Sequence, residues 1–198
     1  LINVDIHIDD EVAFEYFVIR FEDNRCHKFS FHSHAILNLT IDSISSNSKV
    51  FLQTDKIEKF LIQDVDGDQK IDSKSNKFVE INNLEVSNCS NLALLKDCQI
   101  LNFKCISSKT LGGVFENLEL RQWVFDDIGL ALKEITNLKS LLIYSPRNGQ
   151  ETTLTISNRL EYMEISSCNI KPFELSLPRC DFKISNCFNN LSLYFIDS

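Results

Sequence analysis

Glycine and proline are scarce in this sequence of 198 residues, which has only 5 glycines and 3 prolines. Disordered chains and linkers are usually rich in these residues, so the composition argues against both classes. Hydrophobic residues make up 43% of the chain, enough to build a real core. The length suits one domain or one solenoid. The chain begins at Leu1 rather than Met, which leaves room for it to be part of a longer protein.

Clusters of basic residues are absent as well, and the formal net charge is −8. Nucleic-acid binding needs clustered lysine and arginine to neutralise phosphates, so we expect no nucleic-acid partner. No apolar run approaches the roughly 20 residues that a helix needs to cross a bilayer, and no signal peptide is visible. We therefore expect no membrane partner.

Common catalytic motifs are also missing from the sequence. It contains no G-x-S-x-G nucleophile elbow, no glycine-rich phosphate loop and no H-E-x-x-H zinc helix. We therefore expect that the chain is not an enzyme and that it has no catalytic residues and no cofactor.

Three histidines and one cysteine cluster in residues 26–34, with the spacing C-H-x4-H-x-H. A structural zinc site takes four ligands, commonly in closely spaced pairs, and this spacing matches no such pattern. On a strand, His32 and His34 would share one face, because residues two apart point the same way. We interpret them as exposed histidines and predict no metal site.

Residues 64–75 resemble a calcium-binding loop in part, with aspartates at the places of ligands 1, 3 and 5. The glycine that such a loop needs at place 6 is replaced by Gln69. The bidentate glutamate at place 12 is replaced by Ser75. We interpret the segment as an acidic turn between repeats.

A pair of apolar residues separated by one residue recurs eight times, at steps of 15 to 24 residues. Such alternation indicates a strand with one buried face. Most pairs have a further apolar residue three positions upstream, and three have a cysteine three positions downstream. The pairs are Leu39/Ile41, Phe60/Ile62, Leu84/Val86, Phe103/Cys105, Leu118/Leu120, Leu141/Ile143, Met163/Ile165 and Phe182/Ile184.

The repeated pattern L-x-x-L-x-L-x-x-N/C-x-L, clearest in residues 160–170, resembles the leucine-rich repeat family in its cysteine-containing, F-box-associated type. The resemblance implies an α/β fold, a solenoid with one curved parallel sheet of about eight strands and with short helices and loops on the convex side. We assign residues 36–198 to this degenerate solenoid. Residues 1–35 are predicted to form an atypical N-terminal capping repeat or a hairpin.

The alternative fold is a parallel β-helix, whose coils are also about 20 residues long. It predicts two or three strands in each coil and no helix at residues 127–135. The leucine-rich repeat interpretation instead predicts a helix at residues 126–137, where an apolar stripe follows two aspartates that can cap the helix.

The cysteines fit the repeat. Cys89, Cys168 and Cys187 share one repeat position, and Cys105 lies on a predicted strand. We expect them to be buried as small hydrophobic side chains, which suits a reducing compartment. The predicted location is therefore the cytoplasm or the nucleus.

The function implied by the resemblance is protein recognition. A repeat solenoid exposes a continuous concave face that commonly binds a partner. The family type suggests the substrate-reading part of an F-box-type ubiquitin ligase, although no F-box segment is visible. The alternative is a structural scaffold subunit of a larger assembly with no client of its own.

The predicted strand register also places charged residues on the outer face of the sheet. Glu85, Lys104 and Glu119 would be neighbours, and Glu164 would lie beside Lys183. Opposite charges at these positions would favour the register.

One region of this face differs, because it is apolar and aromatic. Leu142 and Tyr144 occupy one predicted strand, Tyr162 the next and Arg121 the previous one. The register places Arg121 beside Tyr144, and Leu142 near Tyr162. Binding hot spots are enriched in tyrosine, tryptophan and arginine, so we predict that these four residues contact a protein partner.

Overall fold

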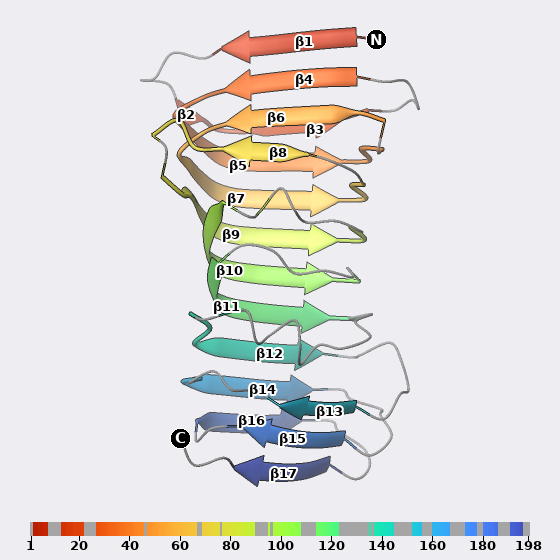
Figure 1. The fold of residues 1–198 in the computed structure, drawn as a ribbon, viewed down its shortest axis with the longest axis vertical. Helices are drawn as coiled ribbons and strands as arrows, with labels where there is room; N and C mark the ends of the chain where they lie inside the picture. The colour runs from red at the N-terminus through yellow and green to blue at the C-terminus, as the bar shows by residue number, and fades with distance from the viewer. Residues whose placement is uncertain are drawn as a thin grey trace.

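The computed structural model is a parallel β-solenoid, a chain wound into stacked coils (Figure 1). All strand pairs of the described residues are parallel. The structure describes residues 2–7, 13–21, 27–45, 47–66, 69–75, 77–89, 95, 97–107, 114–122, 135, 137–144, 152–155, 160–166, 173–177, 180–185 and 191–195.

One long sheet runs along the solenoid, and two shorter sheets accompany it. The long sheet comprises β2 (Ala13–Phe14), β3 (Phe17–Arg20), β5 (Ala35–Asp42), β7 (Lys56–Gln63), β9 (Val79–Ser87), β10 (Cys98–Ile106), β11 (Val114–Arg121), β12 (Ser140–Tyr144), β14 (Tyr162–Ser166) and β16 (Asp181–Ser185). The first short sheet comprises β1 (Ile2–His7), β4 (His27–His32), β6 (Lys49–Gln53) and β8 (Lys70–Asp72). The second comprises β13 (Thr152–Thr155), β15 (Phe173–Leu177) and β17 (Leu191–Phe195).

Where two sheets are present, each coil contributes one strand to a short sheet and the next strand to the long sheet, as β4 and β5 or β6 and β7 do. In Figure 1 the arrows of β4, β6 and β8 therefore point opposite to those of β7, β9 and β10. Residues 1–35, which we expected to form a capping repeat or a hairpin, contribute β1 and β4 to the first short sheet and β2 and β3 to the long sheet.

The predicted α/β fold, with leucine-rich-repeat helices on the convex side, is wrong. The described residues are nearly all strand and contain no α-helix. The expected helix at 126–137 lies outside the described residues except for Ile135 and Asn137, which are not helical. The parallel β-helix that we held as the alternative describes the observed architecture. Within the described part of the chain, no helix is long and apolar enough to span a bilayer.

The physical reason for the error lies in the segments that connect one strand of the long sheet to the next. Phe31 and Leu52 belong to β4 and β6, where inward and outward residues alternate, and both are fully buried. Alternation of this kind buries one face of a strand, whereas a helix needs an apolar residue every three or four positions. These segments therefore form a second sheet across the core.

The register predicted for the long sheet is confirmed. All eight apolar pairs align across neighbouring strands, from Leu39 opposite Phe60 through to Met163 opposite Phe182. The predicted column of Ile41, Val86, Leu120, Ile143 and Ile165 is buried, with no member more than 1% exposed. The sequence interpretation missed a ninth pair on β3, where Phe17 and Ile19 align with the first of the eight pairs.

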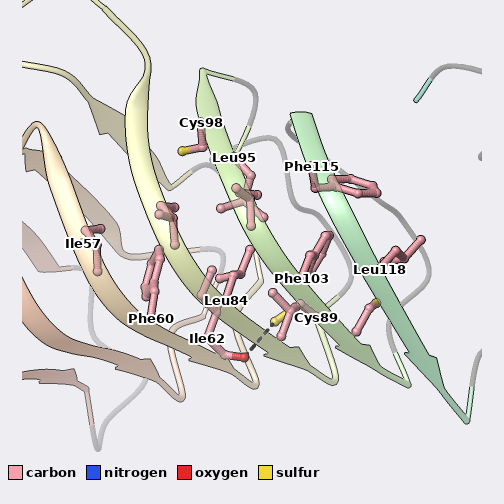
Figure 2. Close-up of a cluster of buried hydrophobic side chains, with 14 of the residues drawn as sticks. Ile57, Phe60, Ile62, Leu84, Cys89, Leu95, Cys98, Phe103, Phe115 and Leu118 are labelled. Carbon is pink, nitrogen blue, oxygen red and sulfur yellow. Dashed lines mark hydrogen bonds between the residues drawn. The ribbon is translucent and has the colours of Figure 1, made fainter. Parts of the chain in front are cut away.

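The core lies between the sheets and runs along the solenoid. Figure 2 shows side chains of successive long-sheet strands gathered in it, with Phe103 and Phe115 in edge contact at 5.1 Å between ring centroids. Phe17 of the long sheet stacks on Phe31 of the short sheet at 4.0 Å, which joins the two sheets in the first coils. Each fully buried side chain of this core, such as Phe31 or Phe103, contributes about 1.5–3 kcal/mol by leaving water.

Each long-sheet strand from β5 to β11 is followed by a residue with positive φ, between 47° and 56°. These residues are Ser43, Asp64, Asn88, Ser107 and Gln122. Left-handed backbone is usually taken by glycine, but asparagine and aspartate tolerate it at a modest cost. Asp64 and Asn88 fit this preference, whereas Ser43, Ser107 and Gln122 adopt the same conformation without it. These five corners therefore turn the chain without glycine.

These corners extend the sheet ladder by one residue, and the first three then direct the chain inward. The backbone N–H of Ser43 donates to Gln63 at 3.0 Å, and each later corner donates to the next strand in the same way. Ile44, Val65 and Cys89 follow the first three corners directly, and none is more than 2% exposed. The corner is therefore part of the core packing as well as of the sheet.

The two predicted core cysteines that the structure describes, Cys89 and Cys105, are buried, and so is Cys98, for which we made no prediction. Cys89 and Cys105 are each 2% exposed, and Cys98 is fully buried. Burial, with a smaller effect of the Asp97 charge, raises the pKa of the Cys98 thiol to about 12. Cys168 and Cys187 lie outside the described residues.

Candidate binding surface

The strands of the long sheet bend at the same place. Between buried Ile36 and buried Leu39, two consecutive residues, Leu37 and Asn38, both lie on the outer side. The strands β7, β9, β10 and β11 repeat this pattern. The first of the two residues has no partner on the neighbouring strand, so its backbone lies outside the sheet ladder. We call it the passed-over residue.

Asparagine side chains compensate for the interrupted ladder. Asn38 donates its amide to the backbone oxygen of Glu15 at 2.8 Å, and Asn117 donates to that of Leu101 at 3.2 Å. In both cases the acceptor is the passed-over residue of the preceding coil. Each amide therefore gives the carbonyl a partner that the interrupted ladder does not supply.

Three asparagines at this position also hydrogen-bond to one another along the solenoid, whereas Asn38 is separated from them by Lys59 of β7. Asn102 donates to Asn83 at 3.1 Å, and Asn117 donates to Asn102 at 3.0 Å. A side-chain amide offers two donor hydrogens and an oxygen with two lone pairs, so each member retains capacity for a further partner. We call Asn38, Asn83, Asn102 and Asn117 the amide column.

A groove of about 640 Å³ follows the amide column on the outer face of the long sheet. Three consecutive residues of each of five strands line it, namely 38–40, 59–61, 83–85, 102–104 and 117–119. Tyr16 lies at the end nearest the first coil, and Leu142 of β12 lies at the opposite end. Six steps between neighbouring strands, at about 4.8 Å each, give the groove a length of about 29 Å.

The charges in the groove alternate in sign. Lys104 pairs with Glu85 at 2.8 Å between Nζ and Oε2, as the register predicted. Glu119 aligns with Lys104 in the backbone register, but its carboxylate pairs with Arg121 on its own strand. The groove therefore offers amides and paired charges rather than a field of one sign.

The four predicted contact residues lie at the Leu142 end of the groove. Arg121 aligns with Tyr144, and the guanidinium carbon lies 5.2 Å from the centre of the tyrosine ring. Tyr162 aligns with Ser140, so it is a diagonal neighbour of Leu142 rather than its direct partner. Among the four, only Leu142 also lines the groove.

A hydrogen-bonded group holds the far side of this patch. Tyr162 donates its hydroxyl to Glu164 at 2.8 Å, and Lys183 donates to the same carboxylate at 3.0 Å. These bonds, that of Lys183 first, lower the pKa of Glu164, and the bond to Glu164 raises the pKa of the Tyr162 hydroxyl. The predicted Glu164–Lys183 pair is therefore confirmed, and it orients Tyr162.

Sequence reasoning missed the groove and its amide column. The signal was present, since Asn38, Asn83, Asn102 and Asn117 all directly precede the first member of an apolar pair. The position of these asparagines could not be interpreted from the sequence, because the bend is not visible there. Only the bend places each side chain outward, beside a carbonyl that has left the sheet ladder.

Histidines are placed differently from the prediction. His32 ends β4, whereas His34 lies beyond the strand and is 3.3 Å from Asp55. The described residues contain one group of three side chains that could hold a metal ion, formed by Asp5, His7 and His32.

The segment that resembles a calcium loop serves the core instead. Gln69, in the place of the required glycine, is buried, and its side-chain oxygen accepts from the backbone N–H of Val50 at 2.7 Å. Its amide donates to the backbone oxygens of Ser48 and Asp66. Gly67 and Asp68 lie outside the described residues.

Comparison of the chain with protein-family models, with curated proteins and with solved structures finds no match. The leucine-rich repeat resemblance therefore rests on the sequence pattern alone.

Proposed function

We propose that the chain is a binding module that holds an extended segment of a protein partner in the groove of the long sheet. The observation that carries this proposal is the continuity of the groove, which is lined at equivalent positions of successive coils. A solenoid forms an extended binding surface by repeating one residue position in this way. An extended peptide of about nine residues would match the groove length at about 3.3 Å per residue.

The chemistry of the lining supports a peptide as occupant. The amide column can donate to and accept from a peptide backbone, which carries one N–H and one C=O at nearly every residue. Leu61 and Leu142 are half-buried and outward, so they offer apolar contacts for side chains. The patch of Arg121, Tyr144 and Tyr162 would extend the contact beyond the groove.

The more specific role in an F-box-type ubiquitin ligase depended on the leucine-rich repeat resemblance. Because the α/β fold implied by that resemblance is wrong, we do not extend the proposal to that role. A structural scaffold remains the alternative function. Selecting peptides that bind to the chain distinguishes a scaffold from a peptide-binding module.

A phage-displayed library of random peptides, selected on the chain, would test the groove. We expect the enriched peptides to lose at least tenfold in affinity for a Leu61→Arg variant, whose longer charged side chain would fill the groove. Leu37→Arg is the matched control, because Leu37 is an exposed leucine of the same sheet that does not line the groove. Peptides that bind Leu61→Arg as well as the unchanged chain would contradict the proposal, and no enrichment would favour the scaffold.

The patch has its own test with the same peptides. Replacing Arg121 and Tyr144 with alanine should weaken binding by at least about 2 kcal/mol, roughly 30-fold, if they are hot spots. The stability should change by no more than about 1 kcal/mol, because an exposed cation–π contact contributes about 0.5–1 kcal/mol. Glu116 and Lys139, an exposed pair that does not line the groove, provide the matched double-alanine control. Unchanged affinity in the Arg121/Tyr144 variant would remove the patch from the binding surface.

A further inference from the structure

Three metal-ligating side chains meet on the outer face of the first short sheet. Asp5 and His7 lie two residues apart on β1, and His32 aligns with His7 on the neighbouring strand β4. The two imidazole rings stack, with centroids 4.1 Å apart and planes at 9°. All three side chains offer a ligand atom within 4.8 Å of the other two.

Each imidazole has a nitrogen close to one oxygen of the Asp5 carboxylate. His7 Nε2 lies 3.4 Å from Asp5 Oδ2, and His32 Nε2 lies 3.4 Å from Asp5 Oδ1. Zinc binds imidazole nitrogen and carboxylate oxygen at about 2.0–2.1 Å with tetrahedral geometry, which places two ligand atoms about 3.3–3.4 Å apart. Both nitrogen–oxygen distances are too long for a good hydrogen bond and close to that separation, although they run to different oxygens of the carboxylate. Because an imidazole binds a metal in the plane of its ring, the exposed His7 ring must turn out of the stack to share an ion with His32.

The orientation of His32 gives a second, independent indication. Its Nδ1 lies 2.8 Å from Oε1 of Gln53, and an amide oxygen only accepts hydrogen bonds. Nδ1 therefore carries the proton in this arrangement, and the lone pair is on Nε2, the atom that lies near Asp5. Metal-binding histidines are usually oriented in this way by a bond at the other ring nitrogen.

The surroundings of His32 also fix its position. The ring is packed between His7 and the edge-on ring of Phe51, whose centroid is 5.8 Å away. The side chain of His32 is only 16% exposed, whereas those of Asp5 and His7 are 60% and 68% exposed. An ion could therefore enter from solvent and bind one ordered ligand first.

We propose that Asp5, His7 and His32 bind one divalent transition-metal ion of the late first row, such as Zn²⁺. Imidazole with a carboxylate is a ligand set that suits zinc, nickel and copper rather than calcium or magnesium. Solvent completes the coordination, because the protein supplies three ligands. The ion joins β1, an edge strand of the first short sheet, to its neighbour β4.

The chain contains a matched control for this site. His34 Nδ1 lies 3.3 Å from Asp55 Oδ2, which is the same type of pair with no third ligand among the described residues. The other oxygen of Asp55 accepts from the hydroxyl of Ser73 at 2.7 Å and from Ser75 at 3.0 Å. His34 should therefore contribute nothing to metal affinity.

Isothermal titration of the full chain with Zn²⁺ tests the proposal. We expect the chain and His34→Ala to bind one equivalent at this site with the same affinity, and His7→Ala and His32→Ala to lose at least tenfold. Gln53→Ala should lose about 10-fold to 100-fold, the range for removing an orienting partner. Because His7 is exposed, His7→Ala keeps the test valid even if His32→Ala fails to fold.

Cysteines could bind zinc as well, so the ligand type needs its own measurement. Co²⁺ bound at this site should give visible ligand-field bands without the near-ultraviolet charge-transfer band of a cobalt–thiolate bond. The bands should disappear in His7→Ala and persist in His34→Ala. A thiolate band, affinity that is unchanged in His7→Ala, or no binding to the unchanged chain would each overturn the proposal.

Discussion

Truncation of Ile143 to alanine should destabilise the solenoid by about 2–5 kcal/mol, the range for a buried isoleucine. The side chain is 1% exposed and lies in its column between Leu120 and Ile165 of the neighbouring strands. The change removes three carbon groups, which costs about 2.4 kcal/mol at about 0.8 kcal/mol per group. A cavity adds to this cost, because the sheet ladder on both sides prevents the neighbours from closing the gap.

Ile184 provides the matched control for this prediction. It occupies the same column on β16, the last strand of the long sheet, but it is 42% exposed. The alanine substitution there removes the same groups from a site that is only partly out of water. We expect a cost of about 1 kcal/mol, because less apolar surface is lost from the core and solvent can fill the gap.

Urea unfolding followed by far-ultraviolet circular dichroism measures both costs at 25 °C. The dependence of stability on urea should be compared first, because a solenoid can unfold in parts and its slope would then change. With equal slopes, the difference in midpoint gives the difference in stability. Equal losses at the two sites, or a loss below about 1 kcal/mol for Ile143→Ala, would refute the column as the source of stability.

Three further predictions concern the corners, the acid limb and the buried thiols. Ser107→Val should destabilise by about 1–2 kcal/mol in urea unfolding, because a β-branched residue is strongly disfavoured at positive φ, and Ser107→Gly should not. Burial tends to raise the pKa of Asp42, but hydrogen bonds from Ser43 and Arg20 outweigh it and the pKa is lowered. The stability that ionised Asp42 contributes is fully present above its unfolded pKa, near 3.9, and is lost as the pH falls through its lower folded pKa. Between pH 5 and pH 2 the unchanged chain should therefore lose more stability than Asp42→Asn. Cys98 should react with a thiol reagent at pH 8 only on unfolding, since its pKa is about 12; rapid labelling of the native chain, seen by mass spectrometry, would contradict this.

The register of the long sheet could be predicted because one rule governs it. A parallel strand buries alternate residues, and a slip of one residue would place Ile62 in water and Gln63 in the core. A slip of one residue is therefore excluded, and matching whole apolar pairs sets the register whatever the length of the connections between them. This is why steps as different as 15 and 24 residues still led to the observed partners.

The fold class could not be settled by the same rule. A leucine-rich repeat and a two-sheet solenoid share one inward strand in each unit, and they differ in the segment that connects this strand to the next unit. The signal that distinguishes the two folds was a second set of alternating apolar residues, on the strands of the short sheet. Phe29 and Phe31 align there with Val50 and Leu52, which follow them by 21 residues. The family pattern covers only the long-sheet strand, so it assigned Phe29 and Phe31 to the N-terminal capping repeat or hairpin. It left Val50 and Leu52 in a connection between repeats.

The histidine cluster shows where ligands should be sought in a fold of this kind. A helix or a tight loop brings ligands together at fixed short spacings, which is why sequence motifs for metal sites are local. In a solenoid the neighbours of a residue lie one coil away, and coil lengths vary. His7, His32 and Gln53 follow one another by 25 and 21 residues, yet they align on adjacent strands. A search within residues 26–34 therefore pairs His32 with the wrong histidine, and the correct partner becomes visible only once the register of the short sheet is known.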